Sequence, residues 1–163
     1  MAINVIVSPL QEIDINAQAE QTVLVLSNQI IPANISPSEY FNGENKDTIP
    51  LSAGMVVCRY PTGEGVYRAT ATGNARHGIG LVTIAALPGF TCRVQLTGVF
   101  ELEDWTAITG AANLQALGVY YLSETPGQLT TTPPALSGTV QQQIGKALST
   151  TIMQIDVAYA ILN

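Results

Sequence analysis

The stretch from residue 118 to residue 155 reads as short strands separated by turns, and it constrains the fold more than any other part of the chain. Residues 119–122 (VYYL) are β-branched, aromatic or apolar, which favours a strand. Pro126 and Gly127 then predict a turn, because proline fixes φ and glycine accepts a positive φ. Three further strands are predicted at 128–132, 143–148 and 151–155. This pattern indicates an all-β protein.

An earlier stretch follows the same plan, at a spacing of 64 or 65 residues. The matched positions are Gly54 with Gly118, Gly63 with Gly127, and Ile79 and Gly80 with Ile144 and Gly145. Residues 91–96 likewise resemble residues 151–156. Self-similarity at a fixed spacing is typical of repeated architectures. We therefore predict a diverged duplication of one four-strand unit; the alternative is that two unrelated β-meanders share turns at similar spacing.

The middle of the chain fits the same all-β pattern. Residues 79–87 are predicted to form a strand, Pro88 and Gly89 a turn, and residues 90–102 a long strand that bends at Gly98. A short helical segment after Asp104 is the only helix expected, because Gly110 weakens a longer one.

The first 50 residues differ from the rest. Residues 30–50 contain three prolines and no regular pattern, and such a long irregular stretch is unusual inside a compact domain. We therefore predict an extended N-terminal arm over residues 1–50 for contact with other subunits or a capsid, with short strands at 3–7 and 22–26. A β-barrel or sandwich body is predicted over residues 51–163. The alternative is a disordered tail, although the arm is richer in apolar residues than such tails.

Charge is scarce in this chain. Charged residues make up 11% of the sequence, where about a quarter is usual. So few charges do not cover the surface of an ordinary monomer, and we expect a surface rich in Thr, Ser, Gln and Asn that is partly buried against other subunits. The net charge of −6 disfavours nucleic-acid binding, which needs Lys and Arg for phosphate contacts. No segment approaches the length of a transmembrane helix, and no signal peptide is visible at the start.

Candidate catalytic groups are few. His77 is the only histidine and lies in a glycine-rich segment, where an exposed histidine is common. Glu101 and Glu103 are spaced to share one strand face, with Asp104 beside them. Paired carboxylates run glycoside hydrolysis or hold Ca²⁺, although acids that end a strand are more often solvated. A carbohydrate-active enzyme that uses Glu101 and Glu103 is therefore one hypothesis, and the low charge argues against it.

The remaining motifs are weaker. Gly138, Gly145 and Lys146 resemble a phosphate-binding loop, but the spacing is wrong and Ala147 stands where Ser or Thr is needed. Cys58 and Cys92 form no C-x-x-C motif, so free, partly buried thiols are expected. We predict no catalytic residue, no cofactor and no metal site.

Three aromatic residues allow two interpretations. Trp105, Tyr120 and Tyr121 either form a platform on which a sugar stacks or pack in a core or interface, and packing is favoured.

Four short motifs carry a resemblance to a known family. They are GVFEL at 98–102, VYYL at 119–122, GQLTTT at 127–132 and IGKAL at 144–148. With them, residues 51–156 resemble the small capsid decoration, or cement, proteins of tailed bacteriophages. Similar segments also resemble parts of phage head and tail fibres. The resemblance implies a β-barrel or sandwich body, trimers at capsid threefold positions and no enzymatic activity.

The resulting expectation is a virion structural protein on the outer capsid surface, made in the host cytoplasm. Its expected partners are two further copies of itself, as a homotrimer, and the major capsid protein, with no nucleic acid or membrane. The alternative is a fibre or receptor-binding module that recognises a host surface glycan.

Overall fold

The computed structural model describes residues 38–59, 65–72 and 76–163, together with four short strands nearer the N-terminus at 2–7, 11–16, 25–26 and 29–30. The chain divides into two compact units, Met1–Ile35 and Ser36–Asn163. In the first unit, β1 (Ala2–Val7) pairs antiparallel with β2 (Gln11–Asn16), and β3 (Val25–Leu26) pairs with β4 (Gln29–Ile30). The strand predicted at 3–7 is confirmed as β1.

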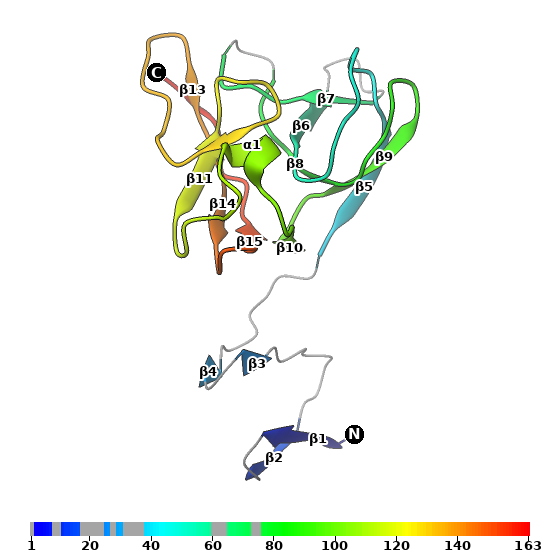
Figure 1. The fold of residues 1–163 in the computed structure, drawn as a ribbon, viewed down its shortest axis with the longest axis vertical. Coiled ribbons are helices and arrows are strands. Elements are labelled where there is room, and N and C mark those ends of the chain that lie inside the picture. The colour runs from blue at the N-terminus through cyan, green and yellow to red at the C-terminus, as the bar shows by residue number, and fades with distance from the viewer. Residues whose placement is uncertain are drawn as a thin grey trace. The chain divides into compact units, whose positions relative to one another are not determined.

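The second unit, here called the body, contains two five-stranded antiparallel sheets (Figure 1). The first sheet has the order β5-β9-β8-β6-β7 and the second the order β10-β15-β14-β11-β12. The strands of the first sheet are β5 (Tyr40–Glu44), β6 (Val56–Arg59), β7 (Val66–Arg68), β8 (Gly80–Ile84) and β9 (Thr91–Gln95). Those of the second are β10 (Gly98–Glu101), β11 (Val119–Leu122), β12 (Leu129–Thr130), β14 (Gln143–Ala147) and β15 (Ile152–Ile155).

A two-stranded ribbon and one helical turn complete the body. The ribbon pairs β13 (Val140–Gln141) with β16 (Ile161–Leu162), and α1 (Thr106–Thr109) ends at Gly110 in a left-handed conformation. The all-β prediction is confirmed, and the body is sandwich-like and not a closed barrel. The strand predicted over 90–102 is two strands in different sheets, because the chain crosses from β9 to β10 at Gly98, whose φ is +95°.

The two sheets repeat one topology, which supports the predicted duplication, although each unit has five strands and not the four predicted. Taken in order, each strand of the first sheet has a counterpart at the same place in the second. The register agrees as well: Val57 pairs with Gly80 as Tyr120 pairs with Gly145. At the sheet edge, Phe41 pairs with Val94 as Phe100 pairs with Met153.

The repeat also corrects two of the sequence matches. Val94 occupies the place of Met153, so residues 91–96 correspond to residues 150–155 and not to residues 151–156. The Met55 N–H donates to the Ser52 carbonyl (3.2 Å) as the Gly118 N–H donates to the Gln115 carbonyl (2.8 Å). Gly54 therefore corresponds to Leu117 and not to Gly118. Both have a positive φ, +84° for Gly54 and +64° for Leu117. Gly63, which was matched to Gly127, lies outside the described residues.

The N-terminal boundary of the body differs from the prediction. Residues 40–44, assigned to the arm, form β5 and pair along their whole length with β9. Leu51 is fully buried and exchanges two hydrogen bonds with Ala86. The body therefore begins at Ser36 and not at Leu51. The prediction failed because Asn42, Gly43 and Glu44 hide the strand pattern, and only pairing with β9 makes this segment a strand.

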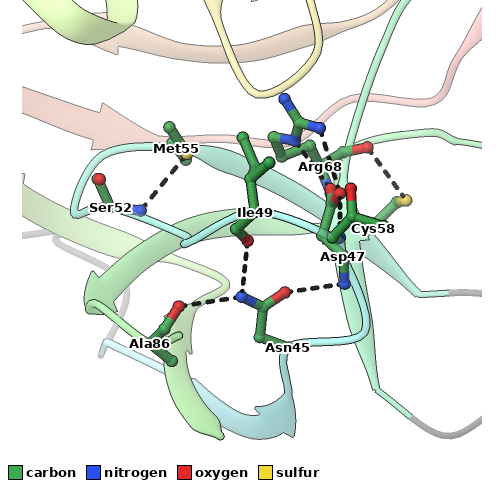
Figure 2. A network of polar contacts seen from close by, with 9 residues as sticks. Asn45, Asp47, Ile49, Ser52, Met55, Cys58, Arg68 and Ala86 are labelled. Carbon is green, nitrogen blue, oxygen red and sulfur yellow. Dashed lines mark hydrogen bonds and ion pairs between the residues drawn. The ribbon is translucent and has the colours of Figure 1, made fainter. Parts of the chain in front are cut away.

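A polar network holds the segment after β5 against β7 (Figure 2). The fully buried Asn45 donates through Nδ2 to the carbonyls of Ile49 (3.0 Å) and Ala86 (2.9 Å). Asp47 accepts hydrogen bonds from Arg68 Nε (2.8 Å) and from the Arg68 N–H (3.1 Å). Burial alone would raise the pKa of the Asp47 carboxyl, but the hydrogen bonds from Arg68 outweigh it and hold the pKa at about 2.

Two apolar clusters form the core. The larger extends across both sheets, and the smaller lies within the first half of the body. Fully buried members of the larger cluster include Val56, Leu81, Trp105, Ile108, Leu122, Ile144 and Met153; the smaller includes Leu51, Val57, Val66, Val82 and Val94.

Candidate functional site

The aromatic residues proposed as a sugar platform lie mainly in the core. Trp105 is fully buried, meets Phe100 edge to face at 5.7 Å between ring centres, and donates through Nε1 to the Thr151 carbonyl (3.2 Å). Tyr120 is also buried, and its hydroxyl accepts from the Gln115 N–H (2.8 Å). Only Tyr121 is partly exposed. The platform is therefore wrong and the packing interpretation is right for Trp105 and Tyr120.

The three acids near β10 do not share one strand face. The strand ends at Glu101, so Glu103 is not on the predicted strand face, and all three side chains are exposed. Asp104 Oδ1 accepts from the Thr106 N–H (2.8 Å) and hydroxyl (2.6 Å), and these hydrogen bonds lower the pKa of its carboxyl. Asp104 thus accepts hydrogen bonds from the first residue of α1, but the N-cap position of this helix is Trp105, whose side chain makes no capping hydrogen bond. Among the described residues, no group of three His, Cys, Asp or Glu side chains is placed to hold a metal ion.

His77 lines a small pocket of about 180 Å³ whose other walls are Val140, Ala160 and Leu162. These three neighbours offer neither a carboxylate to orient the imidazole nor a nucleophile for it to activate. Apart from His77, the side chains that line the pocket are apolar.

The glycines singled out in the sequence have packing roles. A Cβ at Gly80 would clash with the Gln95 carbonyl, and a Cβ at Gly145 would clash with the Gln154 carbonyl. These two glycines occupy equivalent places in the two sheets and allow neighbouring strands to approach. Gly145 therefore belongs to a strand and not to a phosphate-binding loop.

Both cysteines are free and buried, and burial raises the pKa of each thiol. The prediction of free thiols is confirmed. A raised pKa leaves little thiolate near neutral pH, so neither group is activated as a nucleophile.

The first exposed apolar surface, here called the tip surface, consists of Ile84, the last residue of β8, and of Leu87 and Phe90 in the connection from β8 to β9. Leu87 is 59% exposed and Phe90 65% exposed. The Phe90 N–H donates to the Leu87 carbonyl (3.0 Å) across the predicted Pro88–Gly89 turn, and Gly89 has a φ of +81°. Hydrogen bonds from the Gly89 N–H to Asn45 (2.7 Å) and from the Asn45 N–H to Phe90 (2.8 Å) hold the turn in place.

The tip surface is absent from the second half. The equivalent connection, between β14 and β15, spans residues 148–151, shorter than residues 85–90 between β8 and β9, and its last three residues are Ser149, Thr150 and Thr151. The duplication therefore left one half with an apolar projection that the other half lacks.

The second exposed apolar surface, here called the ribbon surface, consists of Leu136, Tyr159, Ile161 and Leu162 around the β13–β16 ribbon. Tyr159 is 97% exposed, Ile161 63% and Leu162 59%. Figure 1 shows the C-terminus beside β13, and the Asn163 N–H donates to the Thr139 carbonyl (3.0 Å). Sequence reasoning missed this surface as a site; the signal was the absence of charge over residues 157–163.

Comparison of the chain with models of known protein families gives no match, and comparison with curated proteins gives no significant match. Within the part of the chain that the structure describes, no helix is long and apolar enough to cross a membrane.

Proposed function

We propose that this protein is a virion structural protein that decorates the outside of a phage capsid as a trimer and stabilises the head. The observation that supports it is the pair of separate apolar surfaces, tip and ribbon, on a body with few charges. A monomer rarely keeps large apolar patches in water, because their burial against a partner is favourable. Two such surfaces suit a subunit that contacts both its own copies and another protein.

The tip surface is assigned to the capsid. Backbone hydrogen bonds hold its turn at both ends. Docking Leu87 and Phe90 therefore costs little conformational entropy, because the backbone is already ordered. One contact of this size is weak, but a trimer presents three at once, and their effective concentration makes the combined binding tight. The major capsid protein is the partner in this proposal.

The resemblance to phage decoration proteins supports the same assignment, through motifs that form β10, β11, β12 and β14. The alternative of a glycan-binding module has lost the aromatic platform on which it depended, since Trp105 and Tyr120 are buried.

The first test is the copy number of this protein in purified virions, measured by quantitative mass spectrometry against the major capsid protein. A ratio near one to one supports a capsid-wide decoration lattice. A handful of copies moves the protein to a fibre or tail, and absence from virions refutes the proposal.

The second test uses capsids that lack the protein. The double variant Leu87→Asp, Phe90→Asp is expected to fold but to lose capsid binding in a sedimentation assay. Leu148→Asp, a substitution of an exposed apolar residue in the second half, is the matched control and is expected to bind normally.

A further inference from the structure

The ribbon surface contains a strand whose outer edge is unpaired among the described residues. β16 pairs with β13 alone. The other side of β13 is already occupied, because the Val140 N–H donates to the Ala71 carbonyl (2.7 Å) and Thr139 bridges to Thr72. β16 is therefore the outermost strand of this small sheet.

The direction of its backbone groups follows from the hydrogen bonds at the chain end. The Asn163 N–H donates to the Thr139 carbonyl (3.0 Å), and the Asn163 carbonyl accepts from the Gly138 N–H (3.1 Å). Because these directions alternate along an antiparallel strand, the N–H and C=O groups of Leu162 face away from β13. One donor and one acceptor of β16 thus point outward along the free edge.

The side chains of this edge strand are apolar on both faces. Successive residues of a strand point to opposite faces, and Ile161 and Leu162 are nonetheless both more than half exposed. Monomeric proteins protect such edges with charged residues, prolines or bulges. Residues 157–163 (VAYAILN) contain no charge, proline or glycine. The edge has the features of a strand that pairs with another chain.

The N-terminal unit contains a hairpin for which the described residues provide no third strand. The hairpin of β1 and β2 pairs Ile3 with Ile15 and Val5 with Ile13. A two-stranded hairpin is at best marginally stable in water and needs a third strand or a packing partner. Among the described residues, β1 pairs with β2 alone.

Charge selects β1 and not β2 as the pairing edge. β1 (AINVIV) is uncharged, whereas Glu12 and Asp14 lie on β2. Pairing β16 with β1, and not with β2, brings two uncharged strands together, and burying an unpaired charge is costly. One such contact gives both β1 of the hairpin and β16 of the ribbon a further neighbouring strand.

We propose that the free edge of β16 in one copy of this protein accepts β1 from the N-terminal hairpin of a second copy. The two surfaces are different, so the contact is heterologous and closes into a ring when the rotation between copies allows it. This inference rests on the self-assembly in the proposed function and is independent of the capsid as target.

The first test blocks the β16 edge in the full-length protein. Leu162→Pro removes a backbone donor that faces outward and leaves the ladder to β13 intact. We expect the wild type to be oligomeric by light scattering after size-exclusion chromatography, and the variant to elute at the monomer mass of 17.2 kDa. Leu162→Lys should give the same result by placing a charge on the edge, and Ile84→Lys, on the tip surface, should leave the oligomer unchanged.

Circular dichroism separates loss of assembly from loss of fold. Both edge variants are expected to keep the β-sheet spectrum of the wild type. A monomeric wild type, or two folded edge variants that remain oligomeric, would overturn the proposal.

The second test identifies the donor by disulfide trapping between separately purified full-length proteins. One protein carries Leu162→Cys, and the other carries a single cysteine at one position from 2 to 7. The native Cys58 and Cys92 are buried and stay unreactive under native conditions. We expect mixed disulfides that peak at alternate positions of β1, because alternate residues share a face.

Ile84→Cys in place of Leu162→Cys is the control for random collision. Trapping no stronger than in this control refutes β1 of a second copy as the occupant. A bond that forms only when both cysteines are in the same chain also refutes it. None of these outcomes predicts a change in the copy number of the protein in virions. The disulfide experiment can therefore refute this inference without refuting the proposed function, and the copy number can refute the proposed function alone.

Discussion

The ion pair of Asp47 and Arg68 makes a quantitative prediction about acid stability. The pKa of Asp47 is lowered from 3.8 to about 2 in the folded protein. A shift of one unit corresponds to about 1.4 kcal/mol, so this carboxylate contributes roughly 2 kcal/mol to the free energy of unfolding near neutral pH. The Asp47 side chain is largely buried, at 9% exposed, so the figure needs little reduction for solvent screening.

The sign follows from the direction of the shift. Because the folded pKa lies below the unfolded one, the contribution is fully present above about pH 4 and is lost as the pH falls through about 2. Asp47→Asn keeps the shape but has no carboxylate to titrate. We therefore expect the variant to be about 2 kcal/mol less stable than the wild type near pH 6, and the difference to shrink toward zero near pH 2.

Trp105 provides the assay. It is the only tryptophan and is fully buried, so its fluorescence reports unfolding in urea. Protein concentration is held constant, since assembly would otherwise shift the midpoint. Glu44→Gln is the matched control: Glu44 pairs with Lys46 at 2.8 Å, but both side chains are partly exposed, and such pairs contribute less than about 1 kcal/mol. A difference between wild type and Asp47→Asn that does not change with pH would refute the reasoning.

Two further predictions concern stability. Gln142→Leu is expected to lower the free energy of unfolding by about 3 kcal/mol, because the buried amide accepts from the Gly78 N–H (2.8 Å) and donates to the Gly78 and Ala158 carbonyls (both 3.0 Å). The neighbouring Gln143→Leu should change it by less than about 0.5 kcal/mol, and equal effects in urea titrations would contradict this role. Leu117→Gly is expected to raise stability by roughly 0.5 kcal/mol, because Leu117 has a φ of +64° and is 70% exposed, so relief of strain outweighs the small loss of burial. A lower melting temperature for Leu117→Gly would contradict the strain argument, because the entropic cost of glycine would then outweigh the relief at the positive φ.

Turns were predictable because their signals are local. Pro88 with Gly89, and Pro126 with Gly127, form turns in which the glycine has a φ of +81°, as the dipeptides indicated. The duplication was also visible, since the turns and strands of both halves keep their order. The glycine match at Gly118 was off by one residue, because Leu117 occupies the left-handed position that glycine occupies at Gly54. A residue match reports identity and not backbone conformation.

The candidate site was less predictable than the fold. Trp105 and Tyr121 are both aromatic, but Trp105 is fully buried and Tyr121 is partly exposed. The ring contact with Phe100 and the hydrogen bond to the Thr151 carbonyl belong to the tertiary structure, and the sequence did not predict them. The ribbon surface depends on which strands lack neighbours, and that is a property of the assembled sheet.

The sequence by itself determined the all-β class, the turns and the two-unit plan, because strand propensity, proline and glycine act over a few residues. The tertiary structure decided the rest through contacts between distant residues. Pairing with β9 made residues 40–44 a strand of the body, and Gln142 joined Gly78 across 64 residues of chain. The absence of a neighbour among the described strands left β16 as an open edge. The surfaces that remain available to partners are those that the fold leaves exposed. Exposure depends on contacts between residues far apart in the sequence, so no single stretch of sequence predicts it.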